Sequence, residues 1–381
     1  MRFAIIGTGF VADYYMTTLV NHPELELAGV FDTNSVRLQQ FCAFHKVKPY
    51  ESMAALLADD SVDMVAVLTT PETHFEITSA VLDAGKHVYC EKPLATDMDN
   101  ACKLVTQAAN ARLIIAGAPA NAYSEAFLAT KNALDTSEIG TPKLVYAEME
   151  DGAVFRERWQ EWRSQSGAPW PGRHEFEIGC TLEHAGYGLS WLVGLFGSIR
   201  HISGTSATLF LDKGVDIALE NMAPDFSTAV LAFENGVIAR LTCGLCAPKD
   251  RSLTIMGDGG TLTVADLWDN RSQIHIERIG ENPSTLFRVF RRLEAIRGKF
   301  LPAKIPAGRK LKYGNLRKSA LPSYPSQIDF AAGLLQIAKS AQGAGKSRKV
   351  LAAEALHITE AALALNRISD HDGRYIMTSS I

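Results

Sequence analysis

Phe3-Ala4-Ile5-Ile6-Gly7-Thr8-Gly9-Phe10-Val11-Ala12 is the stretch of the sequence that decides the fold. Four apolar residues lead into two glycines. Gly7 permits a tight turn after a strand, and Gly9 lets a ligand approach the backbone closely. The N-terminus of a following helix favours negative charge. The stretch therefore predicts a dinucleotide-binding unit in which Gly7, Thr8, Gly9, Phe10 and Val11 hold the pyrophosphate, with Ala12 at the third glycine position.

The next hundred residues alternate short apolar runs with longer stretches of helical periodicity, which is typical of a parallel sheet with crossover helices. Strands are expected at residues 3–6, 27–31, 62–68, 87–90 and 113–116, and helices at 11–21, 35–45, 72–84 and 97–110. We therefore predict a doubly wound α/β domain, a Rossmann domain, over residues 1–120.

Beyond residue 143 the pattern changes to strands joined by hairpin signals, such as Asn235-Gly236. Helices are expected at 182–195, 327–341 and 351–366. These features predict a second, α+β domain over residues 121–381, with an open, mainly antiparallel sheet, and we expect the final helices, 327–366, to pack back on the first domain.

The composition is that of a globular chain: of 381 residues, 47% are hydrophobic and 21% are charged. No apolar run reaches the roughly 20 residues of a membrane span, and the N-terminus does not resemble a secretory signal, so we expect a cytoplasmic protein. Six cysteines are too few for a disulfide framework. Cys243 and Cys246 have the spacing of a metal or redox pair, but no second pair follows, and we expect no metal site.

An acidic residue, Asp32, lies at the end of the second expected strand, 23 residues after Gly9. An acid at this position can accept hydrogen bonds from both ribose hydroxyls of NAD and would repel the 2'-phosphate of NADP. Arg37 nearby leaves NADP open as an alternative. Asp32 could instead act as a helix cap together with Asn34 or Ser35.

Glu91-Lys92-Pro93 follows the fourth expected strand, at the carboxyl edge of the sheet, where ligands bind in doubly wound folds. The ammonium of Lys92 can donate a hydrogen bond to a substrate oxygen and stabilise a developing alkoxide. The alternative is a surface ion pair between Glu91 and Lys92.

The chain resembles the glucose-fructose oxidoreductase, inositol dehydrogenase and rhizopine-catabolism (Gfo/Idh/MocA) oxidoreductases over almost its full length. The resemblance rests on the glycine loop, Thr70-Pro71 with His74, the run from Ala84-Gly85-Lys86-His87-Val88 into Glu91-Lys92-Pro93, and Ile139-Gly140. It implies NAD(P)-dependent hydride transfer at a secondary alcohol or ketone of a sugar, nucleotide sugar or cyclitol, and a homodimer or homotetramer assembled through the second sheet. It also implies a catalytic role for Lys92 and places Thr70, Pro71, His74, Glu91 and Lys92 at the cofactor. The charge distribution, with one basic segment on an otherwise acidic chain, separately leads us to expect no nucleic acid partner.

A third family motif lies on a helix of the second domain, where the family has an Asp and, four residues later, a His. This sequence has Glu183 and Tyr187 instead. Residues i and i+4 share a helix face, so both can reach one crevice. Tyr187 can then exchange the substrate proton if the Lys92 ammonium lowers the pKa of its phenol. The alternative is a solvent-facing amphipathic helix. His184 is interpreted as a structural or secondary polar residue, and it is also a candidate substrate contact.

Three of the five tryptophans, Trp159, Trp162 and Trp170, lie within twelve residues and close to Arg156. Indole faces stack on sugars and arginines bind anionic groups, so these residues could form a substrate lid. An oligomer contact would use the same residue types.

Residues 286–318 contain eleven basic residues and one acid in a chain whose net charge is -4. Its first part, residues 286–297, is amphipathic at helical spacing. The segment could contact an anionic membrane surface or another acidic partner, dock on its own protein, or border a nucleotide-sugar phosphate.

Two other functions remain open from the sequence: a redox-neutral glycosidase that uses NAD transiently, and a non-catalytic NAD-binding regulator. The presence of Lys92, Glu183 and Tyr187 favours an enzyme over a regulator.

Overall fold

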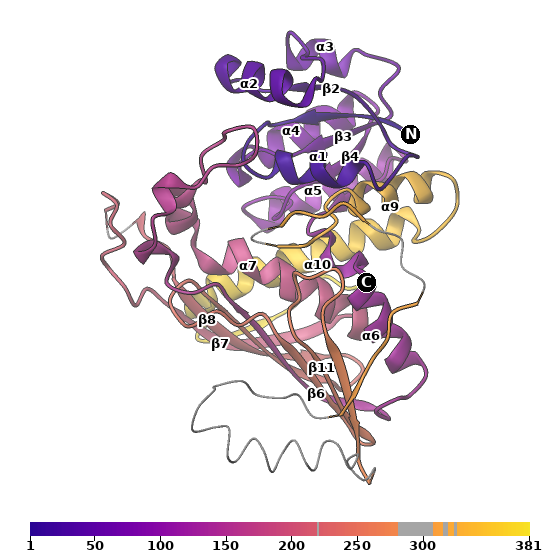
Figure 1. Cartoon of the computed structure of the whole chain (residues 1–381), viewed down its shortest axis with the longest axis vertical. Coiled ribbons are helices and arrows are strands. Elements are labelled where there is room, and N and C mark those ends of the chain that lie inside the picture. The colour runs from indigo at the N-terminus through magenta and orange to yellow at the C-terminus, as the bar shows by residue number, and fades with distance from the viewer. Residues whose placement is uncertain (219–220, 281–307, 315–318, 324–325) are drawn as a thin grey trace.

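The computed structural model describes residues 1–218, 221–280, 308–314, 319–323 and 326–381 (Figure 1). Within these ranges the first sheet has five parallel strands in the order β2-β1-β3-β4-β5. The strands are β1 (Arg2–Ile6), β2 (Glu26–Phe31), β3 (Met64–Val67), β4 (His87–Cys90) and β5 (Ile115–Gly117). β2 lies on one side of β1 and β3 lies on the other, so the order of the strands reverses at β1. The loops that follow β1 and β3 therefore flank the crevice in which a doubly wound sheet binds its ligand.

Helices cover both faces of this sheet because its strands are apolar on both sides. Phe3 and Ile5 of β1 pack on one face, and Ala4 and Ile6 pack on the other. One face is covered by α1 (Ala12–Leu19), α2 (Ser35–His45) and α9 (Ala332–Ala341), and the other by α3 (Met53–Leu57), α4 (Pro71–Asp83) and α5 (Met98–Asn110). The strands and helices predicted from periodicity are present, and the sequence pattern missed only the short helix α3 in this region.

The second sheet has nine strands among the described residues, in the order β13-β12-β11-β10-β6-β9-β8-β7-β14. All neighbours are antiparallel except β6 and β9, which confirms the predicted open, mainly antiparallel sheet. The turn predicted at Asn235-Gly236 joins β8 to β9, with Gly236 at φ +87°. The strands are β6 (Pro142–Glu150), β7 (Ile199–Ala207), β8 (Phe226–Phe233), β9 (Ile238–Gly244), β10 (Leu253–Gly257), β11 (Gly260–Val264), β12 (Ile274–Arg278), β13 (Arg309–Lys310) and β14 (Arg374–Ile376).

Helix α7 (Gly172–Phe196) lies on the inner face of the second sheet and turns its other side to the first domain (Figure 1). It begins ten residues before the predicted start at residue 182. Gly179 interrupts it with a positive φ of +87°, and a Cβ there would lie 2.8 Å from the carbonyl oxygen of Pro224. The helical spacing of apolar residues does not continue across this glycine. The sequence pattern therefore indicated only the second part of the helix.

The last long helix, α10 (Arg348–Asn366), packs on α5 and β5 of the first domain and also on α7 and β7 of the second. The hydroxyl of Thr359 on α10 accepts a hydrogen bond from the backbone N–H of Leu94 at 3.2 Å. The remaining elements of the described chain are α6 (Glu125–Asp135) and the short 3-10 helices η1 (Ala120–Tyr123), η2 (Val154–Arg156), η3 (Trp159–Glu161) and η5 (Ile368–His371).

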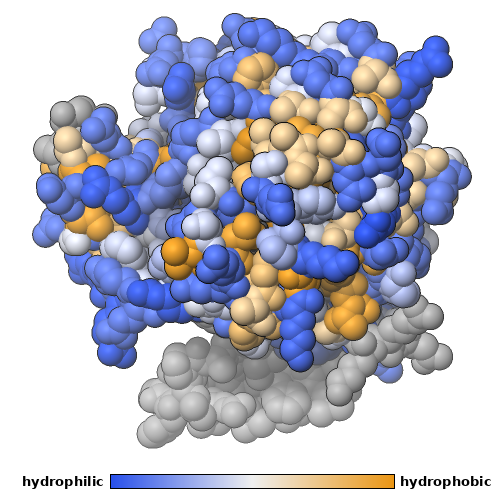
Figure 2. All heavy atoms as spheres, turned by 90° about the horizontal axis from the view of Figure 1, so that it is seen from above, coloured by the Kyte–Doolittle hydropathy of each residue, from blue (hydrophilic) through white to orange (hydrophobic). Residues whose placement is uncertain are grey.

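The surface seen from above the first domain is mainly hydrophilic, with apolar residues in small groups (Figure 2). None of the helices in the described ranges combines the length and the apolar character that crossing a membrane requires. Most of the basic segment 286–318 lies outside the described residues, and its predicted anionic contact stays a prediction. Of the described part, Arg309 and Lys310 form β13 at the edge of the second sheet.

Candidate active site

The glycine loop connects β1 to α1 as predicted, and its geometry leaves room for a phosphate group. Gly7 has φ +99°, and a Cβ there would lie 2.6 Å from the carbonyl oxygen of Leu68, so only glycine fits. At Gly9 a Cβ would meet no atom within 4 Å, so the backbone faces open space in front of the N-terminus of α1. Thr8 is buried, whereas Phe10 and Val11 are partly exposed. These observations fit the pyrophosphate of a dinucleotide.

Asp32 lies beside this loop at the end of β2. Its Oδ2 accepts hydrogen bonds from the backbone N–H and the hydroxyl of Thr8 at 2.7 and 2.8 Å, and its Oδ1 accepts one from Asn34 N–H at 2.8 Å. The side chain that caps α2 is Asn34, which accepts from the backbone N–H of Arg37. Asp32 is therefore not the helix cap, and its partly exposed carboxylate keeps lone pairs for ribose hydroxyls.

Arg37 is the residue for which the sequence analysis kept NADP as an alternative cofactor. In the structure its guanidinium makes hydrogen bonds to other parts of the protein. Its Nε donates to the carbonyl oxygen of Thr8 at 2.6 Å and its Nη1 to that of Ser166 at 2.9 Å. Its Nη2 donates to the hydroxyl of Ser166. The guanidinium is thus held between the glycine loop and the second domain, and it is not directed at a 2'-phosphate.

The loops after β3 and β4 are joined by His74, which is fully buried. Its two ring nitrogens lie 2.7 Å from the carbonyl oxygen of Pro93 and 3.0 Å from that of Thr69. A ring between two carbonyl acceptors donates from both nitrogens, as an imidazolium does. Burial lowers the pKa of His74, but Cys90 and the two carbonyls raise it more, to about 9. Any effect of His74 on a cofactor therefore goes through the loops of Pro71 and Lys92, because both of its nitrogens are already bonded.

Lys92 extends from the carboxyl end of β4, with a cis bond to Pro93, and meets α7 of the second domain. Its Nζ lies 2.5 Å from Oε2 of Glu183, and both side chains are only slightly exposed. The aliphatic part of Lys92 passes close to Gly186, where a Cβ would lie 3.8 Å from its Cγ. Glu91 points away, and its Oε1 accepts a hydrogen bond from the Tyr15 hydroxyl at 2.7 Å. The alternative interpretation of a surface ion pair between Glu91 and Lys92 is therefore wrong. Lys92 instead pairs with Glu183 of the second domain.

The electrostatics of this pair keep it charged. Burial lowers the pKa of Lys92, but the charges of Glu183 and the neighbouring acidic groups raise it above its ordinary value. Burial raises the pKa of Glu183, but the ammonium of Lys92 and the hydrogen bond from it lower that pKa more. The pair consequently presents an ammonium group held in a fixed position beside a carboxylate.

Tyr187 lies one turn after Glu183, and the centre of its ring is 5.8 Å from Nζ of Lys92. Burial raises the pKa of Tyr187 above its ordinary value, and the lowering by Lys92 does not offset burial together with Glu91, Glu183 and Glu175. The sequence hypothesis that Lys92 brings this pKa below 10 is therefore wrong for the site without ligands. The phenol is held in its neutral form.

Glu175, which the sequence did not indicate, belongs to the same cluster. Burial and the negative charge of Glu183 raise the pKa of Glu175 well above its usual range. The interruption at Gly179 lies between Glu175 and Glu183, so helical periodicity in the sequence does not relate the two residues. The prediction missed Glu175 because it started the helix at residue 182.

A second cluster adjoins Tyr187 on the side of the second domain. The ring of Trp268 lies 4.8 Å from that of Tyr187 and 5.8 Å from that of His184. Arg251 lies 4.1 Å from the centre of the Trp268 ring and forms ion pairs with Asp151 and Asp266. His184 Nε2 is 3.3 Å from Asp151, which agrees with its interpretation as a secondary polar residue. Only the tertiary structure brings Trp268 to this site.

The tryptophans of residues 159–170 pack against each other. Trp162 lies 5.0 Å and Trp159 lies 5.9 Å from Trp170, and both Trp159 and Trp170 contact Phe176 of α7. The guanidinium of Arg156 lies over the rings of Phe155 and Phe210. A substrate role for Arg156, Trp159, Trp162, Trp170 and His184 stays a prediction.

Cys243 and Cys246 are protonated thiols. Burial raises the pKa of Cys243 well above its usual range and that of Cys246 to about 11. In the part of the chain that the structure describes, no three His, Cys, Asp or Glu residues gather as a metal ion would require.

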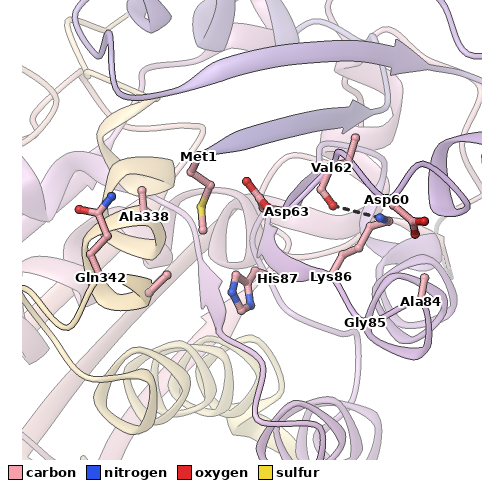
Figure 3. Close-up of a pocket in the computed structure, with 11 residues that line it drawn as sticks. Met1, Asp60, Val62, Asp63, Ala84, Gly85, Lys86, His87, Ala338 and Gln342 are labelled. Carbon is pink, nitrogen blue, oxygen red and sulfur yellow. Dashed lines mark hydrogen bonds between the residues drawn. The ribbon is translucent and has the colours of Figure 1, made fainter.

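A cavity of about 540 Å³ lies at the opposite, amino edge of the first sheet (Figure 3). Met1, Asp63 and His87 line it where β1, β3 and β4 begin, and Gln342 borders it from the end of α9. Nζ of Lys86 donates to the carbonyl oxygens of Asp59 and Val62. The cavity is on the side of the sheet away from the glycine loop, so it is separate from the candidate site.

Comparison with known proteins assigns both parts of the chain to one family. Residues 1–117 match the GFO/IDH/MocA model described as "Oxidoreductase family, NAD-binding Rossmann fold", and residues 127–263 match the "GFO/IDH/MocA C-terminal domain". The two matches cover the glycine loop, Lys92, Glu183 and Tyr187.

Individual relatives with a curated name match only part of this chain, at modest sequence identity. A 1,5-anhydro-D-fructose reductase of Ensifer adhaerens is 29% identical over 163 residues, which are 42% of this chain and 48% of that protein. A trans-1,2-dihydrobenzene-1,2-diol dehydrogenase of Bos taurus is 23% identical over 269 residues, 70% of this chain and 74% of that protein. The aligned segments thus span about half and about three quarters of these relatives.

Solved structures share the fold along the whole chain. The WlbA dehydrogenase of Bordetella pertussis, solved in complex with NADH and UDP-GlcNAcA, superposes with a TM-score of 0.71 at 18% identity and covers 99% of this chain and 97% of that one. At this identity the likeness shows the fold alone.

Proposed function

Because the chain belongs to the GFO/IDH/MocA oxidoreductase family, with its NAD-binding Rossmann fold, we propose that it is an NAD-dependent enzyme that transfers hydride at a secondary alcohol or ketone of a sugar or sugar derivative. The observation that carries this proposal is the Lys92 ammonium, held 2.5 Å from Glu183 and beside the ring of Tyr187 in the crevice between the domains. The names of curated relatives, a sugar reductase and an inositol dehydrogenase among them, support this substrate class.

The described residues fit NAD. The glycine loop would hold the pyrophosphate in front of α1, Asp32 would accept hydrogen bonds from the ribose hydroxyls, and the loops that carry Thr70, Pro71 and Lys92 would border the nicotinamide end. When bound, NAD accepts or supplies the hydride.

The side chains of the crevice would bind the reacting oxygen, hold Lys92 in position and transfer the proton. Lys92 donates a hydrogen bond to the reacting oxygen of the substrate and stabilises its negative charge. Glu183 holds the lysine in place through the charged hydrogen bond at 2.5 Å. In the reduction of a ketone, Tyr187 gives the proton of its neutral phenol to that oxygen and becomes a phenolate. In the oxidation of an alcohol, the phenolate form of Tyr187 accepts the substrate proton.

The surroundings of Lys92 favour a neutral, hydroxyl-bearing substrate at the reacting end. Glu175, Glu183 and Asp151 supply acidic groups around the crevice, and the cationic Arg251 is already paired with Asp151 and Asp266. The indole of Trp268 beside Tyr187 offers an apolar face of the kind that packs on the C–H groups of a sugar ring.

A matched pair of variants tests this function. We would screen the purified protein against neutral sugars, cyclitols and nucleotide sugars with NAD⁺, and follow NADH by its absorbance. Once the screen has found a compound that the protein oxidises, Lys92→Met should lower its turnover at least about 100-fold, while NADH should still bind. Lys131→Met removes an exposed lysine whose partner is Asp135 and should change nothing.

Two outcomes would contradict the proposal. Cleavage of a glycoside without net NADH formation would indicate a redox-neutral glycosidase. Binding of NAD⁺ without turnover of any compound in the panel would favour a regulator.

A further inference from the structure

The two sides of the ligand crevice are bonded to the same piece of the second domain. We name residues 162–174 the bridging segment; it runs from the end of η3 into the first turn of α7 and reaches the first domain from below in Figure 1. The sequence indicated a possible substrate lid at its tryptophans but gave no sign of the contacts with the first domain.

The first half of the bridging segment is a small, well-braced hairpin. Arg163 and Pro169 form an isolated bridge, Ser164 N–H donates to the carbonyl oxygen of Ala168 at 2.8 Å, and Trp170 N–H donates to that of Trp162 at 3.1 Å. The packed tryptophans form the base of this hairpin, and Ser166 lies at its tip. The hairpin therefore holds the tip in one position without help from the first domain.

Ser166 contacts the side of the crevice that follows β1 and β2. Its hydroxyl donates to Oδ2 of Asp13, in the first turn of α1, at 2.7 Å, and its carbonyl oxygen accepts from Nη1 of Arg37 at 2.9 Å. Arg37 in turn donates to the carbonyl oxygen of Thr8 in the glycine loop. Asp13 is fully buried beneath the tip, and His45 contacts its other oxygen.

His174 contacts the opposite side, which follows β3. Its Nε2 lies 2.8 Å from Oε1 of Glu72, in the first turn of α4. Burial raises the pKa of Glu72, but hydrogen bonds from the backbone and from His174 bring it below its ordinary value, so the carboxylate is charged in this contact.

Because β1 and β3 are neighbours, a segment bonded to the elements after both strands passes across the crevice between them. We propose that the bridging segment is a strap over the bound dinucleotide, and that Ser166 and His174 are positioning residues that set how fast the cofactor leaves. This inference rests on the proposed NAD-dependent function and extends it to cofactor retention.

The test measures NADH dissociation directly, without turnover. The protein loaded with NADH is mixed with excess NAD⁺ in a stopped-flow instrument, and the loss of NADH fluorescence gives the dissociation rate. Ser166→Ala and His174→Ala should each release NADH about 10-fold faster than the wild type, and Ser166→Thr, which keeps a hydroxyl, should restore slow release. Arg173→Ala is the matched control, because the partner of Arg173 is Glu177, one turn later on α7 of the second domain.

Hydrogen exchange of the wild-type protein provides a second measurement that needs no variant. NADH should slow amide exchange in residues 162–174 as well as in the glycine loop. Dissociation at the wild-type rate in both alanine variants, or unchanged exchange in the bridging segment, would overturn the strap alone. A wild-type protein that does not bind NADH would overturn the strap and the proposed function together.

Discussion

At the scale of single residues, Tyr187 stands where the family has a histidine, and burial among carboxylates keeps its phenol protonated. We expect Tyr187→Phe to lower turnover about 100-fold or more, because phenylalanine keeps the ring beside Trp268 but has no proton to transfer. Because the pKa of the Tyr187 phenol is raised, the rate of alcohol oxidation by the wild type should rise with pH towards the alkaline range, and the variant should lack this rise. An unchanged profile with a small loss of turnover would instead leave the proton transfer to Lys92.

Asp32 and Arg37 make a separate prediction about the cofactor. NADH should bind at least about 10-fold more tightly than NADPH, because the carboxylate repels a 2'-phosphate and Arg37 is held by Thr8 and Ser166. Calorimetric titration measures both constants. Asp32→Ala should reduce the difference in affinity between NADH and NADPH. Asp99→Ala, at an exposed position on α5, should leave that difference unchanged. Equal binding of both cofactors by the wild type would contradict the preference for NAD.

At the scale of elements, His74 ties the loop after β3 to the loop that carries Lys92. Its pKa of about 9 exceeds the unfolded value of 6.5. A pKa raised by folding adds stability that is fully present below pH 6.5 and is lost as the pH rises through 9. His74→Gln should therefore lower the free energy of unfolding by up to about 3 kcal/mol near pH 6 and by much less near pH 9.5. Urea titrations at the two pH values measure the difference, and an equal loss at both would show that the histidine is neutral.

At the scale of the whole molecule, the outer face of the second sheet exposes apolar side chains grouped around one arginine. Tyr146, Arg240 and Val230 are cross-strand neighbours on β6, β9 and β8, and Ile238 lies two residues from Arg240 on the same face. Val230 is 46% exposed, and α7 covers the opposite face of the sheet. We propose that this group is the contact of a homodimer or homotetramer.

Val230→Asp should reduce the molar mass measured by light scattering, because a buried, unpaired carboxylate disfavours association. Leu128→Asp places the same charge at an exposed position on α6, outside the sheet, and should leave the mass unchanged. A wild-type monomer, or a Val230→Asp variant with the wild-type mass, would contradict this contact.

The sequence alone determined the first domain and the residues that have a local signal. A strand, two glycines and a helix start are consecutive, so the position of the glycine loop follows from turn geometry. The parallel order of the strands follows from the alternation of elements, and Glu183 and Tyr187 share a helix face because four residues make about one turn.

The tertiary structure alone decided which distant groups meet. Lys92 and Glu183 are 91 positions apart, Ser166 and Asp13 are 153 apart, and Trp268 reaches Tyr187 from the connection between β11 and β12. It also set the pKa of Tyr187, since that depends on how deeply the phenol is buried and on which carboxylates surround it. Periodicity records which face of an element is apolar. The pairing of faces from different domains, and the electrostatic field they produce, depend on packing that short-range patterns in the sequence do not describe.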